Sequence, residues 1–159
     1  MTRGLPSITA ALLAVALVGC SKPEHATGAA AAPEPAKVSA MPASSSLDEG
    51  PRAADSPVDK SLEDQGEKLF QDKGCSACHT FGKKLTGPDL AGVTRRRTAR
   101  WIERQILHPE LMVKEDPIAK QLFATHMLQM PNQGLTEAQA KAVIEYFKHQ
   151  DQESAGGDN

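Results

Sequence analysis

Two cysteines and a histidine stand together near the middle of the chain, in the run Cys75-Ser76-Ala77-Cys78-His79. Residues three positions apart share one face of a helical turn. Both sulfurs can therefore bond to the two vinyl groups on one edge of a haem, while the adjacent imidazole reaches the iron. The spacing C-x-x-C-H is that of c-type haem attachment. The motif predicts one covalently bound haem c, held by Cys75 and Cys78 and ligated by His79.

Three other interpretations compete with haem attachment. A zinc site would need a second pair of ligands at comparable spacing, and the sequence contains none. A thioredoxin-like redox pair would need an α/β domain around it, which the helical patterns described below do not supply. A chance occurrence leaves unexplained why a histidine follows Cys78 directly. Haem attachment is therefore the favoured interpretation.

Four segments after residue 60 carry the signals of helices. They begin near residues 61, 98, 116 and 136. Ser61 followed by Asp64 approximates a capping pair, and Asp116-Pro117 supplies an N-cap and a first-turn proline. The last helix is the clearest, because a capping box at residues 136–139 precedes apolar residues at helical spacing. No alternating β-branched run occurs over residues 61–150, so the sequence predicts an all-α domain.

The aromatic residues show where the core lies. All of them follow residue 60: Phe70, Phe81, Trp101, Phe123, Tyr146 and Phe147. So few aromatic residues make a small core, which a large apolar cofactor would help to fill. Residues 151–159 are polar and are expected to form a disordered tail.

The first twenty residues have the features of an export signal. Arg3 precedes an apolar run, residues 8–18, that is too short to stay in a membrane as a spanning helix. The run Leu17-Val18-Gly19-Cys20 resembles the lipobox of bacterial lipoproteins, and this resemblance implies cleavage before Cys20 and lipidation of its sulfur. The alternative is an ordinary secretory signal in which Cys20 is incidental. We expect a periplasmic protein held to a bacterial membrane by its lipid.

Residues 21–60 differ in composition from the rest of the chain. They contain ten Ala, six Pro and six Ser, with neither an aromatic residue nor a sustained apolar period. Such a segment cannot bury enough apolar surface to fold alone. We expect a disordered, flexible tether between the lipid anchor and a domain at residues 61–150.

From about residue 62 to residue 148 the chain resembles the small class I monohaem cytochromes c. Gly66 and Phe70 match that family's first helix, in which the glycine lets the last helix cross closely, and residues 143–147 match the crossing helix. Residues 86–90, Thr-Gly-Pro-Asp-Leu, match the segment beneath the haem. The resemblance implies a small cytochrome c fold, in which three to four helices wrap around one covalently bound haem.

The resemblance also implies roles for single residues. The carbonyl of Pro88 would accept a hydrogen bond from His79, which orients the imidazole and strengthens its bond to iron, and Leu90 would pack on the haem face. A simple turn proline is the alternative for Pro88. Trp101 could donate its indole N–H to a haem propionate, although an aromatic residue at helical spacing is more often part of the core. Met112 is expected to pack in the haem pocket.

The sixth ligand of the iron decides between two functions, because a filled position makes an electron carrier and an open one allows binding or catalysis. Met130 is the predicted ligand, since it precedes Pro131 and stands six residues before Thr136, as the axial methionine does in the family. Met127, His126 and an open site are the alternatives. We expect a one-electron carrier without enzymatic activity. The alternative function is a five-coordinate haem that binds a small gas or peroxide.

The charge balance of the domain does not indicate nucleic-acid binding. Over residues 61–150, 13 Lys and Arg stand against 11 Asp and Glu, a difference of plus two. Two positive groups, residues 83–84 and 95–100, could dock on an acidic partner near the haem edge, or form ordinary solvated surface. We expect a monomer that exchanges electrons with redox proteins. Overall likeness is to monohaem cytochromes associated with copper-containing respiratory enzymes such as nitrous oxide reductase.

Overall fold

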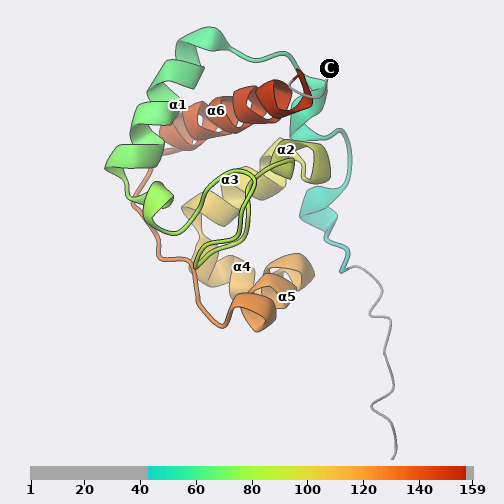
Figure 1. The fold of residues 1–159 in the computed structure, drawn as a ribbon. Coiled ribbons are helices and arrows are strands. Elements are labelled where there is room, and N and C mark those ends of the chain that lie inside the picture. Colours follow the sequence, from blue (N-terminus) through green and yellow to red (C-terminus); the bar gives the residue numbers. More distant parts are fainter. Residues whose placement is uncertain (1–42, 157–159) are drawn as a thin grey trace, which may run out of the picture. The chain divides into compact units, whose positions relative to one another are not determined.

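The computed structural model describes residues 43–156, and over that range helices, joined by loops, are the only regular secondary structure (Figure 1). Six α-helices and three short 3-10 helices succeed one another: η1 Ser46–Asp48, η2 Ala53–Asp55, α1 Lys60–Asp72, η3 Cys75–Ala77, α2 Val93–Arg96, α3 Ala99–Leu107, α4 Pro109–Glu115, α5 Pro117–His126 and α6 Glu137–Gly156. The prediction of an all-α domain is confirmed. The expected signal peptide, the lipidated Cys20 and the first part of the tether lie outside the described residues.

The expected number of three to four helices is too low for the described part of the chain. Neither α2 nor α4 was predicted, because they have four and seven residues and are too short to show a helical period in the sequence. The other helices begin close to where they were predicted, but the predicted capping pair of Ser61 and Asp64 is wrong: α1 begins at Lys60, and its N-cap is Asp59, whose side chain accepts from the Ser61 N–H at 2.9 Å. Thr98 and Asp116 accept hydrogen bonds at the starts of α3 and α5, and Thr136 with Gln139 forms the reciprocal capping box ahead of α6.

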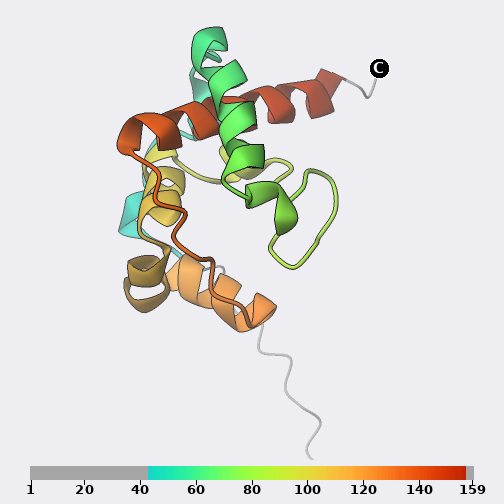
Figure 2. The same cartoon turned by 90° about the vertical axis from the view of Figure 1, so that its left-hand side faces the viewer.

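Figure 2 shows that helices α1 and α6 cross, and Gly66 lies where α1 meets Ala142 of α6. A Cβ atom on Gly66 would lie 2.0 Å from the carbonyl oxygen of Ala142, so only glycine permits this approach. Next to the crossing, the ring of Phe70 packs against Tyr146 and Phe147, with centroids 5.5 and 5.8 Å away. The close crossing that the sequence resemblance implied is present, and it forms one side of the core.

The tether predicted for residues 21–60 ends earlier than expected. Residues 43–59, which we call the strap, lie against α2, α3 and α6 (Figure 1). Ala53 is buried and its N–H donates to the carbonyl of Arg97 at 2.9 Å. The Asp48 carboxylate accepts a hydrogen bond from the Thr98 N–H at 2.7 Å. The composition of the strap gave no sign of this, because small polar residues hold it through hydrogen bonds rather than through an apolar stripe.

The disordered tail predicted from residue 151 is also wrong for its first part. Helix α6 continues to Gly156, and the Asp151 side chain is buried. Its carboxylate accepts hydrogen bonds from the N–H groups of Gly92 and Thr94 and from the Thr94 hydroxyl. A polar residue therefore faces the core, where it satisfies donors at the start of α2. Within residues 43–156, none of the helices combines the length and apolar character that a membrane span requires.

Candidate functional site

The two motif cysteines lie on a tight turn that follows α1. Gly74 adopts a left-handed conformation with φ of 73°, which ends the helix and leads the chain into η3. Hydrogen bonds from the N–H groups of Cys78 and His79 to the carbonyl of Cys75, at 3.1 and 3.0 Å, close the turn. Both thiols are free and line the same pocket. Burial raises the pKa of the Cys75 thiol, whereas cysteines of redox pairs have a lowered pKa.

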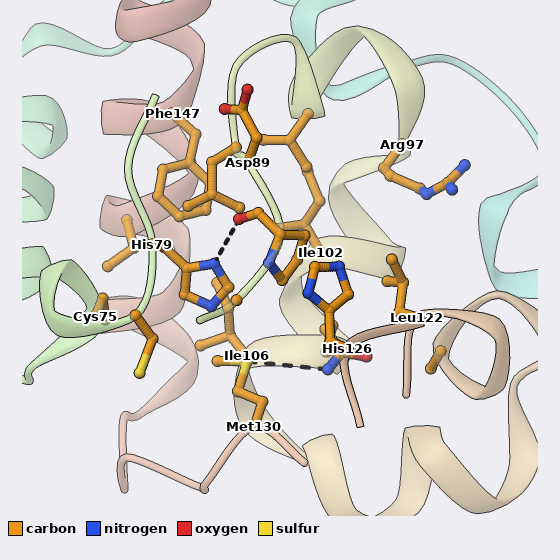
Figure 3. A pocket seen from close by; sticks show the side chains of 18 of the residues that line it. Cys75, His79, Asp89, Arg97, Ile102, Ile106, Leu122, His126, Met130 and Phe147 are labelled. Carbon is orange, nitrogen blue, oxygen red and sulfur yellow. Dashed lines mark hydrogen bonds between the residues drawn. The ribbon is translucent and has the colours of Figure 1, made fainter. Parts of the chain in front are cut away.

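The imidazole of His79 is oriented by a hydrogen bond to the backbone of Pro88. Its Nδ1 lies 2.9 Å from the carbonyl oxygen of Pro88, a distance at which Nδ1–H donates to that oxygen (Figure 3). The other ring nitrogen, Nε2, then carries the free lone pair that a metal requires. Burial lowers the pKa of His79, which favours the neutral, ligating form. A Cβ atom on Gly87 would lie 2.5 Å from the ring, so this close approach also depends on a glycine.

A large pocket occupies the middle of the domain, between α1, α3, α5, α6 and the segment that follows His79. Its volume is about 1350 Å³, including the space open to solvent. Most of its lining is apolar and comes from elements far apart in sequence. The lining includes Phe70, Leu90, Trp101, Ile102, Ile106, Leu122, Val143 and Phe147.

All seven residues that the sequence assigned to the cofactor line this one pocket. They are Cys75, Cys78, His79, Pro88, Leu90, Trp101 and Met130. Figure 3 shows His79 and Met130 within the pocket, carried by separate loops. Met112 does not line it: its buried side chain borders a separate depression beside the strap instead. The expectation that Met112 packs in the haem pocket is therefore wrong, because α4 carries it away from that space.

The two rivals of Met130 lie in different surroundings. Met127 has a side chain 77% exposed, does not line the pocket and adopts φ of 54°, which turns the chain at the end of α5. His126 does line the pocket, and its Nδ1 is buried with no hydrogen-bond partner among the described residues. The structure therefore favours Met130 over Met127 as the ligand, and His126 remains a polar group that lines the cavity.

Trp101 belongs to the pocket wall, but its indole N–H has another partner. It donates to the carboxylate of Asp116 at 3.1 Å, so it is not free for a haem propionate. The guanidinium of Arg97 lies 5.2 Å from the centre of the indole ring, and the same residue lines the pocket. Sequence reasoning missed both Asp116 as a partner of Trp101 and Gln105 as a pocket residue. The four-residue spacing from Trp101 could have placed Gln105 on the same face of α3.

The pocket suits a flat, largely apolar group that bonds to two thiols. Two free cysteines lie at its edge, a neutral imidazole offers a nitrogen inside it, and a thioether sulfur from Met130 faces the same space. Two buried polar atoms in the lining, His126 Nδ1 and Gln105 Oε1, have no partner among the described residues. The donor set of imidazole, thioether and two cysteines fits a haem c.

Comparisons with known proteins agree with this geometry. The sequence model of the family described as Cytochrome c matches residues 63–151. Cytochrome c-551 from Azotobacter vinelandii is 30% identical over 81 residues, which cover 51% of this chain and 92% of that protein.

Solved structures of cytochromes c share the same fold. A cytochrome c from Rhodothermus marinus superposes with a TM-score of 0.59 at 33% identity, covering 64% of this chain and 95% of that one. The cytochrome c domain of the pp3183 protein from Pseudomonas putida gives a TM-score of 0.51 at 36% identity, covering 58% and 92%. The alignments cover almost the whole length of both neighbours. The part of this chain that they share is therefore the helical domain that encloses the pocket.

Proposed function

Since the chain belongs to the cytochrome c family, we propose that it is a one-electron carrier of a bacterial respiratory chain, anchored by a lipid on the periplasmic side of a membrane. Its cofactor is haem c, bound covalently through cysteines, and the attachment motif is that of Cys75 and Cys78. Family members are typically electron carriers rather than enzymes. The proposal therefore concerns the ligands of the iron, the location of the protein and its partners.

One observation carries the carrier function: His79 and Met130 face the same pocket, at whose edge both cysteines lie. When bound, the haem supplies an iron that alternates between Fe(II) and Fe(III). His79 Nε2 and the Met130 sulfur are the two groups that would hold this iron. A pair of protein ligands leaves no position for a substrate, so only electrons are exchanged.

The residues around the ligands keep the site in one arrangement. The Pro88 carbonyl holds the proton of His79 on Nδ1 and fixes the ring orientation. Apolar side chains such as Phe70, Val143 and Phe147 exclude water from the pocket. A thioether ligand in apolar surroundings favours the reduced state of the iron, which indicates a relatively high reduction potential.

A second candidate function rests on the polar atoms of the pocket. His126 Nδ1 and Gln105 Oε1 are buried there without partners among the described residues. Such groups could hydrogen-bond a small gas or peroxide at an iron whose sixth position is open. This function requires that Met130 be a packing residue only, which the experiment below decides.

Export, lipidation and partners complete the proposal. Cleavage before Cys20 and lipidation of its sulfur would place the domain in the periplasm, and the ordered strap confines the proposed tether to residues 21–42. Arg96 and Arg97 line the pocket, and we propose that positive charge near the haem edge guides docking on acidic redox proteins. A copper-containing respiratory enzyme is the partner class that the overall likeness favours.

The test compares optical spectra of the oxidised, haem-loaded full chain with those of Met130→Ala and of Met127→Ala as a matched control. We expect the weak charge-transfer band between iron and thioether in the parent and in the Met127 variant, and its loss in the Met130 variant. Absence of the band from the parent would favour the five-coordinate alternative. Its persistence in the Met130 variant would show that another residue is the ligand.

A further inference from the structure

Helix α5 and the residues that follow it carry apolar side chains on a face that is open to solvent. The opposite face of α5 is buried in the core, where it places Ile118. Phe123 is 39% exposed, Met127 is 77% exposed, and Leu128 is 50% exposed. These are the most exposed large apolar side chains of residues 43–156. Single exposed apolar residues are common, but three within six positions form a patch, which we call the α5 patch.

The segment around the α5 patch carries positive charge and no negative charge. From residue 117 to residue 136 the sequence contains Lys120 and His126 but neither Asp nor Glu. Lys120 is exposed and precedes Phe123 by three residues and Met127 by seven, so the three lie along one face of the helix. An apolar face beside a lysine, without carboxylates, is the composition that suits the headgroup region of an anionic bilayer.

The strap begins next to this helix. The hydroxyl of Ser45 donates to the carboxylate of Asp116, which is the N-cap of α5. The same carboxylate accepts from the Ile118 N–H at 2.9 Å, so the first residues of the strap are attached at the start of α5. This helix has 10 residues, and a helix of that length is about 15 Å long. The α5 patch therefore lies about one helix length from the point where the tether joins the domain.

The proposed anchor brings this part of the domain close to a bilayer. Residues 21–42 separate Cys20 from the strap, and these 22 residues span at most about 75 Å even when fully extended. Attachment through such a segment raises the effective concentration of the domain at the membrane to roughly the millimolar range. A contact too weak to hold a free protein on a membrane is then occupied. Figures 1 and 2 both show α5 at the end of the domain opposite α1 and α6.

We propose that the α5 patch and Lys120 form a docking surface for an anionic phospholipid bilayer, on which the anchored domain lies with α5 toward the lipid. The apolar side chains enter the headgroup region, and the lysine pairs with lipid phosphate. The inference rests on the proposed function, because the lipid on Cys20 brings the domain to the membrane. Met127 does not line the pocket, so a bound haem leaves its surface available for this contact.

The experiment measures how the domain itself binds to vesicles. It uses the haem-loaded mature chain, residues 21–159, exported through an ordinary secretory signal so that it carries no lipid. The vesicles are made of phosphatidylethanolamine and phosphatidylglycerol, and vesicles of phosphatidylcholine serve as the neutral comparison. Sedimentation at lipid concentrations up to about 10 mM, with the bound fraction read from haem absorbance, covers the weak affinities that tethering makes sufficient. We expect binding to the anionic vesicles and several-fold weaker binding to the neutral ones.

Two substitutions separate the apolar part of the contact from the charge. Met127→Asn removes apolar surface, and asparagine tolerates the left-handed φ of 54° at this position. We expect it to lower the partition coefficient about threefold to tenfold. Lys120→Gln should lower it about threefold to fivefold. The matched control is Lys68→Gln, which removes an exposed lysine of α1 and should change the coefficient less than about twofold.

The outcomes distinguish a lipid surface from other partners. A parent that does not bind the anionic vesicles would overturn the inference, and so would equal losses in Lys120→Gln and Lys68→Gln, because binding would then depend on net charge alone. A dimer that is present in the parent and absent from Met127→Asn, without vesicle binding, would assign the patch to a second copy of the chain. Slower electron transfer from Met127→Asn to a soluble redox protein, with vesicle binding unchanged, would assign the patch to a protein partner.

The anchor and the α5 patch are tested separately. The mass of the native protein isolated from membranes shows whether Cys20 is lipidated, and an unmodified Cys20 would contradict the proposed anchor. Absence of vesicle binding by the mature chain would contradict only the α5 patch. If Met127→Asn does not assemble with haem, the comparison of Lys120→Gln with Lys68→Gln still decides the inference.

Discussion

The carboxylate of Asp151 accepts two hydrogen bonds from Thr94, one from its backbone N–H at 2.9 Å and one from its hydroxyl, and both side chains are buried. The same carboxylate also accepts from the Gly92 N–H. These three bonds attach the C-terminal part of α6 to α2, whose Val93 and Arg96 line the pocket. The end of the last helix therefore helps to hold one wall of the cofactor site.

Substituting Asp151→Ala should destabilise the protein strongly. Three donors, two of them buried and one half-buried, lose their acceptor, so we expect the free energy of unfolding to fall by about 2 to 4 kcal/mol. The measurement is urea unfolding of the haem-loaded protein, followed by circular dichroism. Gln152→Ala, at an exposed position on the same helix, is the control and should change the free energy by less than about 0.5 kcal/mol. Equal losses in the two variants would contradict the role of the buried carboxylate.

The sequence predicts well those parts of the fold that depend on residues close together in the chain. The start of α3 near residue 98, the Asp116-Pro117 start and the capping box at residues 136–139 each depend on atoms within one turn, and each lies where it was expected. The C-x-x-C-H motif is equally local. Its position after α1 follows from Gly74, which can adopt the left-handed conformation that the turn requires.

The errors arise where a polar residue finds its partner far along the chain. Asp151 and Thr94 are 57 residues apart, and Ser45 donates to Asp116 across 71 residues. From composition alone, such residues are assigned to a tail or a linker. The partners that bury them lie far away in the sequence, so the neighbouring residues give no sign of them. Gln105 was missed as a pocket residue for a related reason. The surroundings of a single polar residue on an apolar helix face depend on the segments that the fold packs against that face.

The strap should contribute to the stability of the domain. Deletion of residues 43–58 removes the bond from Ser45 to the Asp116 carboxylate and the acceptor that Asp48 offers to Thr98. It keeps Asp59, the N-cap of α1. Because buried or half-buried donors and acceptors lose their partners, we expect a loss of at least about 2 kcal/mol in the free energy of unfolding.

The control for this deletion removes residues 21–42 instead. Those residues precede the strap, and we expect their removal to leave the thermal midpoint of the haem-loaded domain unchanged. Both deletions are measured by thermal unfolding of the secreted protein at equal concentration. If removal of residues 43–58 leaves the midpoint as it is in the parent, the strap adds no stability and its contacts with α2 and α3 are incidental.

Tyr146 should make stability depend on pH in the alkaline range. Its side chain packs against Phe70, and burial, followed by the nearby carboxylates of Glu67 and Glu153, raises its pKa above the ordinary value of 10.0. The unfolded chain therefore loses this proton first. The contribution is fully present below about pH 10 and is lost as pH rises through the folded-state pKa. In urea unfolding at a series of pH values, stability should decline more steeply in the parent than in Tyr146→Phe. Parallel profiles would contradict the shift.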